Sequence, residues 1–141
     1  MQKKDWPNFN KSLILKISKI LSTGKINYTS GPLGKEFEKK FSKFIGNRYS
    51  VAICNGTAAL EVAIKSLQLP KDSEIIVPAR SFFASASCII NTGYKAIFSD
   101  IDPSTQNILL DDIKKKITKK TKAVICVHLA GLPCDMKSIL K

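Results

Sequence analysis

The sequence predicts an α/β fold, built on a mostly parallel sheet with helices on both faces, and three observations support this prediction. From Tyr49 onward, short apolar runs rich in β-branched residues alternate four times with helix-like segments. The connections between them are short, as in βαβ units. The runs are also apolar throughout, which is typical of strands that are covered on both faces of a sheet.

Residues 1–48 are predicted to form an N-terminal helical segment. Apolar residues recur every three or four positions from Phe9 to Leu21, and Thr23-Gly24 ends this helix. After a turn at 29–32, a second amphipathic helix runs from Leu33 to Ile45 and stops at Gly46-Asn47.

Residues 49–141 are predicted to form the α/β domain. The predicted elements are a strand at 50–54, a helix at 57–69, a strand at 74–77, a helix at 83–91, a strand at 95–99, a turn at 102–105, a helix at 111–117, a strand at 122–127 and a final helix that Asp135 begins. The helix at 57–69 is apolar on nearly all sides, so we expect it to be buried. Because the final helix has no stop signal and a parallel sheet needs protected edges, we expect this domain to be the front part of a larger one.

Composition excludes several classes of protein. The chain has 141 residues, 44% of them apolar, which indicates a globular protein with a core. No apolar run is long enough to span a membrane, and the N-terminus lacks the apolar stretch of a signal peptide, so the default location is the cytoplasm. The four cysteines have no C-x-x-C spacing and His128 is the single histidine, so we expect reduced thiols and no metal site.

The formal net charge of +12 raises the question of a nucleic-acid partner. Of the 23 basic residues only Arg48 and Arg80 are arginine, the residue favoured for phosphate forks and base contacts. The lysines are also spread along the chain, so we interpret them as a solvated surface, with no nucleic-acid or membrane partner. A non-enzymatic basic binding domain remains an alternative function.

The corner at Asn55-Gly56-Thr57 joins the first predicted strand to its helix. Ligands of open α/β sheets bind beyond the carboxyl ends of the strands, and the first N–H groups of a helix suit a phosphate. Gly56 would allow close approach of an oxygen, and the Thr57 hydroxyl could add a hydrogen bond. A plain Asn-Gly turn with Thr57 as helix N-cap explains the same residues equally well.

The next two strand ends add candidate residues on the same side of the sheet. Phe82 and Phe83 lie in the loop after the strand at 74–77, where one ring could stack on a planar ligand. We expect Phe83 to be in the core instead. His128 ends the strand at 122–127, and we favour a packed or hydrogen-bonded structural histidine over a functional one.

The motifs NGTAALEVAI, EIIVPARSFFASA, AIFSDIDPSTQNI and VHLAGLPCDM, in this order, resemble the DegT/DnrJ/EryC1/StrS family of pyridoxal-phosphate-dependent aminotransferases, which act on nucleotide-linked keto sugars. SGPLGKEFEKKF resembles the family's N-terminal motif, so the similarity extends from Ser30 to Lys141. It implies the first part of the large domain of a fold type I aminotransferase, and a homodimer. It also implies that Gly56, Thr57 and Ala58 bind the cofactor phosphate and that Phe82 stacks on the pyridine ring.

Other candidate residues would lie near the substrate or behind the residues that contact it: Asn55, Arg80, Ser81 and His128. Ser81 stands where the family usually has Thr, which keeps the hydroxyl. Arg80 replaces a commoner non-basic residue and could serve this protein's own substrate. Ala130 stands where Tyr is frequent, which leaves the surroundings of His128 open.

No lysine is predicted at the carboxyl end of a strand in an apolar setting, where a Schiff-base lysine would be needed. The resemblance implies that this lysine lies beyond Lys141, so the 141 residues alone are expected to be an inactive, truncated cofactor-binding domain. The expected reaction transfers an amino group from a donor such as glutamate to the keto sugar. A dehydratase of the same family, which uses the same cofactor, is an alternative that these residues do not distinguish.

Overall fold

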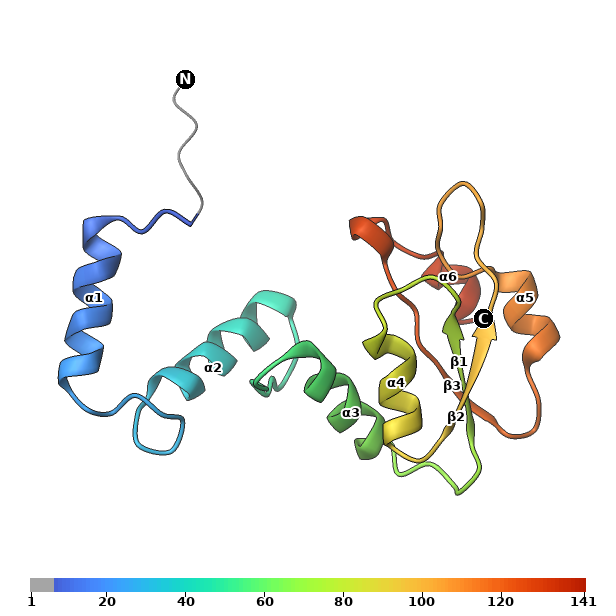
Figure 1. The fold of residues 1–141 in the computed structure, drawn as a ribbon, viewed down its shortest axis with the longest axis horizontal. Helices are drawn as coiled ribbons and strands as arrows, with labels where there is room; N and C mark the ends of the chain where they lie inside the picture. The colour runs from blue at the N-terminus through green and yellow to red at the C-terminus, as the bar shows by residue number, and fades with distance from the viewer. Residues whose placement is uncertain (1–6) are drawn as a thin grey trace. The chain divides into compact units, whose positions relative to one another are not determined.

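The computed structural model describes residues 7–141, which fall into two compact units, one ending at Ala52 and the other running from Ile53 to Lys141 (Figure 1). The first unit is helical and the second is α/β. The domain boundary expected from the sequence lies between residues 48 and 49.

The first unit contains two helices, α1 (Lys11–Ser22) and α2 (Leu33–Ile45), at the predicted positions. The side chain of Asn10 caps α1 by accepting the N–H of Leu13 at 2.8 Å. Gly46 ends α2 in the left-handed region, with φ of 80°, as its stop signal predicted. No residue of either helix is buried, so both apolar faces remain uncovered within residues 7–141.

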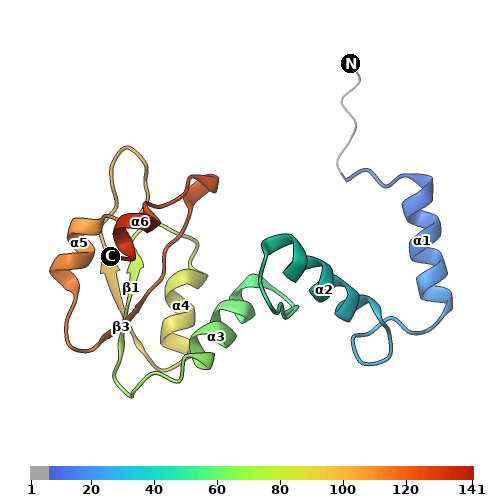
Figure 2. The same ribbon diagram turned by 180° about the vertical axis from the view of Figure 1, so that it is seen from behind.

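The second unit is built on a parallel sheet of three strands in the order β2-β1-β3. The strands are β1 (Glu74–Pro78), β2 (Lys95–Ser99) and β3 (Thr121–Val124). Helices α3 (Gly56–Ser66) and α4 (Ala84–Asn91) cover one face, and α5 (Leu110–Lys116) and the short α6 (Met136–Ile139) cover the other (Figures 1 and 2). The predicted parallel sheet with helices on both faces is confirmed.

The core lies on both faces of β1. Successive side chains of a strand point to opposite faces, and three consecutive residues of β1 are fully buried: Ile75, Ile76 and Val77. Ile75 and Val77 pack with Ile64, Cys88 and Ile89 beneath α3 and α4. Ile76 packs on the other face with Ile108, Ile113 and Cys134. Two separate apolar clusters therefore meet at a single strand.

The strand predicted at 50–54 is wrong. These residues form neither helix nor strand, and no residue in the described part of the chain pairs with them. Val51 is 74% exposed. A β-branched run becomes a strand only where the backbone of a neighbouring strand makes hydrogen bonds with it. Within residues 7–141 no strand lies beside residues 50–54.

The prediction that the helix after Gly56 is buried on nearly all sides is also wrong. Only Ile64 of α3 is buried, and Val62 is about half exposed. One side of α3 packs on α4 and the sheet, while its other apolar residues have no cover within residues 7–141. The helix ends at Ser66 rather than 69.

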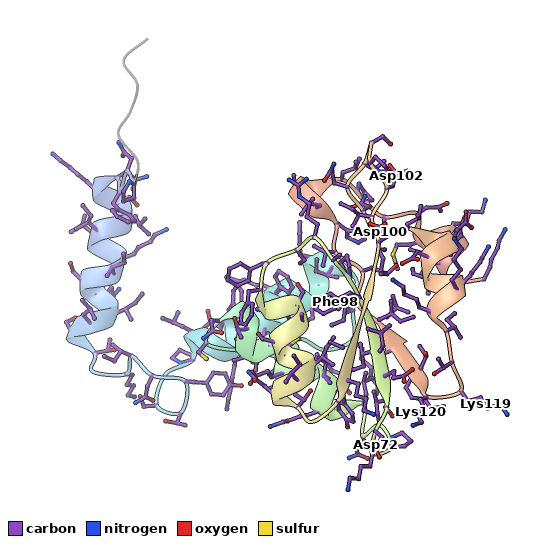
Figure 3. All side chains as sticks on the ribbon, turned by 45° about the vertical axis from the view of Figure 1, so that its right-hand side comes forward. Asp72, Phe98, Asp100, Asp102, Lys119 and Lys120 are labelled. Carbon is purple, nitrogen blue, oxygen red and sulfur yellow. The ribbon has the colours of Figure 1, made fainter. Side chains whose placement is uncertain are left out.

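Charged residues mark the two ends of the sheet. Figure 3 labels Asp100 and Asp102 beyond the carboxyl end of β2, and Asp72, Lys119 and Lys120 at the opposite end.

None of the helices within residues 7–141 is long and apolar enough to cross a membrane.

We expect substitution of Ile76 to destabilise the second unit strongly. Ile76→Ala removes buried atoms from the middle of the central strand and should lower the free energy of unfolding by about 2–5 kcal/mol, whereas Ile76→Val should cost about 0.5–1.5 kcal/mol. Urea denaturation of the whole protein measures both values. Val62→Ala on the exposed side of α3 is the control, and an equal loss there would contradict the assigned core.

The predicted turn at 102–105 is confirmed, and it depends on one carboxylate. Asp102 Oδ1 accepts hydrogen bonds from the hydroxyl and N–H groups of both Ser104 and Thr105. These donors, with the Ser104 hydroxyl foremost, lower the pKa of Asp102 from 3.8 to about 2.

Because the pKa of Asp102 is depressed by folding, the turn should be fully stabilised above pH 3.8 and lose that stabilisation as the pH falls toward 2. Carboxyl-detected NMR titration of the whole protein checks this. A midpoint for Asp102 at or above its ordinary value would contradict the hydrogen bonding, and Asp102→Asn should abolish the titration.

Candidate functional site

The corner before α3 leaves two backbone donors free. Asn55 caps the helix, since its Oδ1 accepts the N–H of Ala58 at 2.9 Å and its carbonyl accepts the N–H of Ala59 at 3.0 Å. The alternative in which Thr57 is the N-cap is therefore wrong. The N–H groups of Gly56 and Thr57 have no acceptor within residues 7–141, and they lie at the positive end of the helix dipole.

Glycine at position 56 is not explained by the fold. Its φ lies outside the left-handed region that favours glycine, unlike those of Gly46 and Gly131. A Cβ built at Gly56 would meet no atom within 4 Å, so packing does not exclude a side chain. The missing Cβ therefore keeps space open beside two unpartnered N–H groups, which suits the close approach of a ligand oxygen.

A pocket of about 680 Å³ opens in front of this corner, within the usual size range of small-molecule sites. Three segments line it: the start of α3, the loop from β1 into α4, and the segment that follows β3. The lining residues are Gly56, Thr57, Ala59, Leu60, Ser81, Phe82, Ala84, Ser85, Val127, His128, Leu129 and Ala130. None of them is a lysine, an arginine or a carboxylate, so the backbone dipoles at the start of α3 are the main source of positive potential in the lining.

The loop from β1 into α4 contributes a hydroxyl pair and an aromatic ring. The hydroxyls of Ser81 and Ser85 lie 2.6 Å apart. Phe82 lines the pocket and is 78% exposed. Phe83 does not line it and is 79% exposed, so its predicted place in the core is wrong. The face of α4 that packs inward begins one residue later, at Ala84.

Arg80 lies in the same loop but is not part of the pocket lining. Its guanidinium donates a hydrogen bond to the side chain of Gln106, which has a left-handed backbone with φ of 62°. Arg80 is thereby tied to the loop that follows β2.

His128 lies beyond the end of β3, which stops at Val124 and is shorter than predicted. His128 is among the residues that line the pocket, and its Nδ1 accepts the N–H of Cys134 at 3.0 Å. The histidine is therefore both hydrogen-bonded by the backbone, as expected, and placed at the candidate site.

No lysine is among the residues that line the pocket. Lys95 begins β2 and Lys122 is the second residue of β3, at the edge of the sheet opposite the pocket.

In the part of the chain that the structure describes, no group of three histidine, cysteine or acidic residues is arranged to hold a metal ion.

Comparison with known proteins identifies the family. The model of the DegT/DnrJ/EryC1/StrS aminotransferase family matches residues 7–141. The chain belongs to this family. It is 42% identical to the GDP-perosamine synthase of Escherichia coli O157:H7 over 107 residues, which is 76% of this chain and 29% of that protein.

Two solved structures show the same fold. The aminotransferase from Psychrobacter cryohalolentis matches with a TM-score of 0.91 and 39% identity, over 97% of this chain and 35% of that one. The E. coli GDP-4-keto-6-deoxy-D-mannose-3-dehydratase, solved with bound hydrated PLP, matches with a TM-score of 0.85 and 30% identity, over 94% and 35%. This DegT-family chain thus has the fold of the first part of the fold type I large domain, and it spans about a third of the length of these relatives.

Several residues of the pocket in this DegT-family chain were not singled out from sequence. Leu60, Ala84 and Leu129 are apolar, so they carry no chemical signal. Ser85 could have been found, because it follows Ser81 by four residues and two hydroxyls at that spacing can meet where a loop enters a helix.

Proposed function

We propose that this chain provides the cofactor-phosphate site of a pyridoxal-phosphate-dependent aminotransferase that acts on a nucleotide-linked keto sugar. The observation that carries the proposal is Gly56, a glycine that the fold does not require, beside the free N–H groups of Gly56 and Thr57 at a helix start. Family membership and the sugar-modifying enzymes among the relatives support the same function.

The residues present fit the cofactor. Gly56 and Thr57 would donate their N–H groups and the Thr57 hydroxyl to the phosphate, and Ala58, whose N–H is held by Asn55, would complete the turn. The exposed ring of Phe82 would stack on the pyridine. Bound pyridoxal phosphate would supply the aldehyde and the electron-withdrawing ring that carry the amino group from donor to acceptor.

The remaining candidates have supporting roles in this proposal. Asn55 fixes the corner by capping α3. Ser81, with Ser85, lines the pocket next to Phe82. Arg80, restrained by Gln106, would lie toward the sugar substrate. His128 lines the same pocket as Gly56 and Phe82 and would stand beside the bound cofactor and its substrate.

The proposal extends to the whole protein. Residues 1–48 would form an N-terminal helical segment and residues 49–141 an incomplete cofactor-binding domain. The reactive lysine would lie outside these 141 residues, because none lines the pocket, so the chain alone would be inactive. The complete enzyme would be a cytoplasmic homodimer that takes its amino group from a donor such as glutamate.

A dehydratase is the second candidate function, because the E. coli dehydratase matches this chain over 94% of its length. The two reactions share the cofactor and differ in their products. Incubating the whole protein with a nucleotide-linked keto sugar and glutamate distinguishes them: an amino sugar supports the proposal, and a deoxygenated keto sugar without nitrogen supports the dehydratase. A basic binding domain would give neither product.

Gly56→Val should weaken binding of pyridoxal phosphate to the whole protein by at least about tenfold, because the branched side chain would obstruct hydrogen bonds to a charged oxygen that are each worth about 1.5–3 kcal/mol. Cofactor titration followed by absorbance measures the affinity. Ala63→Val, which introduces valine elsewhere in the same helix, is the control, since Ala63 is exposed and does not line the pocket. Unchanged affinity in Gly56→Val would refute the phosphate assignment.

Phe82→Ala should weaken cofactor binding more than Phe83→Ala. Stacking contributes about 0.5–1.5 kcal/mol beyond burial, so the difference should be about two- to tenfold. Both side chains are exposed and should cost little stability, which makes them a matched pair. Fluorescence or absorbance titration gives both affinities, and the reverse order would mean that Phe83 is the stacking ring.

A further inference from the structure

The segment from Val127 to Cys134 has little regular structure, and its first four residues, 127–130, form one wall of the pocket. It includes a single turn of 3-10 helix, η1 (Leu129–Gly131), in which Ala130 and Gly131 have left-handed backbones with φ of 51° and 86°. A non-glycine residue in this region needs support from its surroundings. The wall is therefore held in shape by contacts from elsewhere in the fold.

Asn107 supplies the main contact. It is only 5% exposed, at the end of the turn that Asp102 organises. Its Nδ2 donates to the carbonyls of Leu132 and Pro133, both at 3.1 Å, and its Oδ1 accepts the N–H of Leu129 at 3.2 Å. One buried amide thus satisfies three backbone groups, on both sides of the tight turn.

Cys134 closes the segment. Its N–H donates to Nδ1 of His128 at 3.0 Å, and its thiol donates to the carbonyl of Val127 at 3.2 Å. A ring nitrogen that accepts a hydrogen bond carries no proton, so the proton of neutral His128 lies on Nε2. No group within residues 7–141 makes a hydrogen bond with that Nε2, although His128 is a residue of the pocket lining.

We propose that Asn107 is a positioning residue, which holds the wall so that His128 donates through Nε2–H to an acceptor oxygen of the molecule bound in the pocket. This inference rests on the proposed function for the identity of that molecule, and pyridoxal phosphate is the probe. Asn107 itself does not line the pocket, so it acts through His128 and Leu129.

Nitrogen-15 NMR of the imidazole in the cofactor-free whole protein tests the tautomer directly. We expect the shifts of His128, assigned by comparison with His128→Phe, to show a protonated Nε2 and an unprotonated Nδ1. Asn107→Ala should shift them toward a mixture of tautomers. A proton on Nδ1 in the wild-type protein would overturn the proposal without reference to any ligand.

Cofactor affinity tests the coupling between the two residues. His128→Phe and Asn107→Ala should each weaken binding of pyridoxal phosphate about three- to tenfold, as for the loss of one hydrogen bond, and the double variant should bind no more weakly than His128→Phe. Additive losses would mean that Asn107 does not act through His128. If Asn107→Ala fails to fold, Asn107→Asp takes its place, since it keeps the acceptor for Leu129 and loses both donors.

Ser73→Ala is the matched control. Ser73 is also buried and donates to the carbonyl of Pro70 at 2.6 Å, at the opposite end of the sheet. Its loss should therefore lower stability and leave the cofactor affinity and the His128 tautomer unchanged.

The binding results distinguish a failure of this inference from a failure of the proposed function. If Gly56→Val weakens binding while His128→Phe does not, the phosphate site stands and the role of His128 is refuted. If the wild-type protein binds no cofactor, both are refuted.

Discussion

The double burial of β1 is the constraint on which the rest of the second unit depends. This strand is hydrogen-bonded on both sides, and Ile75, Ile76 and Val77 are completely enclosed. Each face must be covered by a helical layer, because adjacent residues of one strand point in opposite directions. Since parallel strands end at the same edge, the loop after β1 and the segment after β3 emerge side by side, and the pocket forms where they meet the start of α3.

Elements with local signals could be predicted from the sequence. The limits of α2 and β2 were correct to the residue. Gly46 stops α2 through its own left-handed backbone conformation. The strand at 50–54 and the burial of α3 were wrong for a shared physical reason. Both depend on a partner element, and an apolar segment carries the same signal whether or not its partner lies within the same 141 residues.

The candidate site divides in the same way. The corner at Asn55-Gly56-Thr57 is contiguous in sequence, so a phosphate site could be predicted there without the structure. The structure was needed to show that Asn55, and not Thr57, is the N-cap of α3. Asn107 could not be found from its neighbours, because the groups it binds lie 22 to 26 residues away along the chain. Phe83 was predicted to be in the core because the inward face of α4 was expected to begin at that residue. It begins one residue later, at Ala84.

In the proposed site, an anionic group would be recognised through dipoles rather than through ionised side chains. Its lining contains no lysine, arginine or carboxylate, and Arg80 in the adjoining loop is tied to Gln106. A phosphate bound there would be held by the free N–H groups at the start of α3, which are fixed by the Asn55 cap and need little reorganisation. The rest of the lining is small, apolar or aromatic, so a ligand with one anionic end and a planar body fits better than one charged throughout. Selectivity would then arise because Gly56 leaves room for a phosphate oxygen, while Phe82 and His128 contact the planar body of the ligand attached to that phosphate.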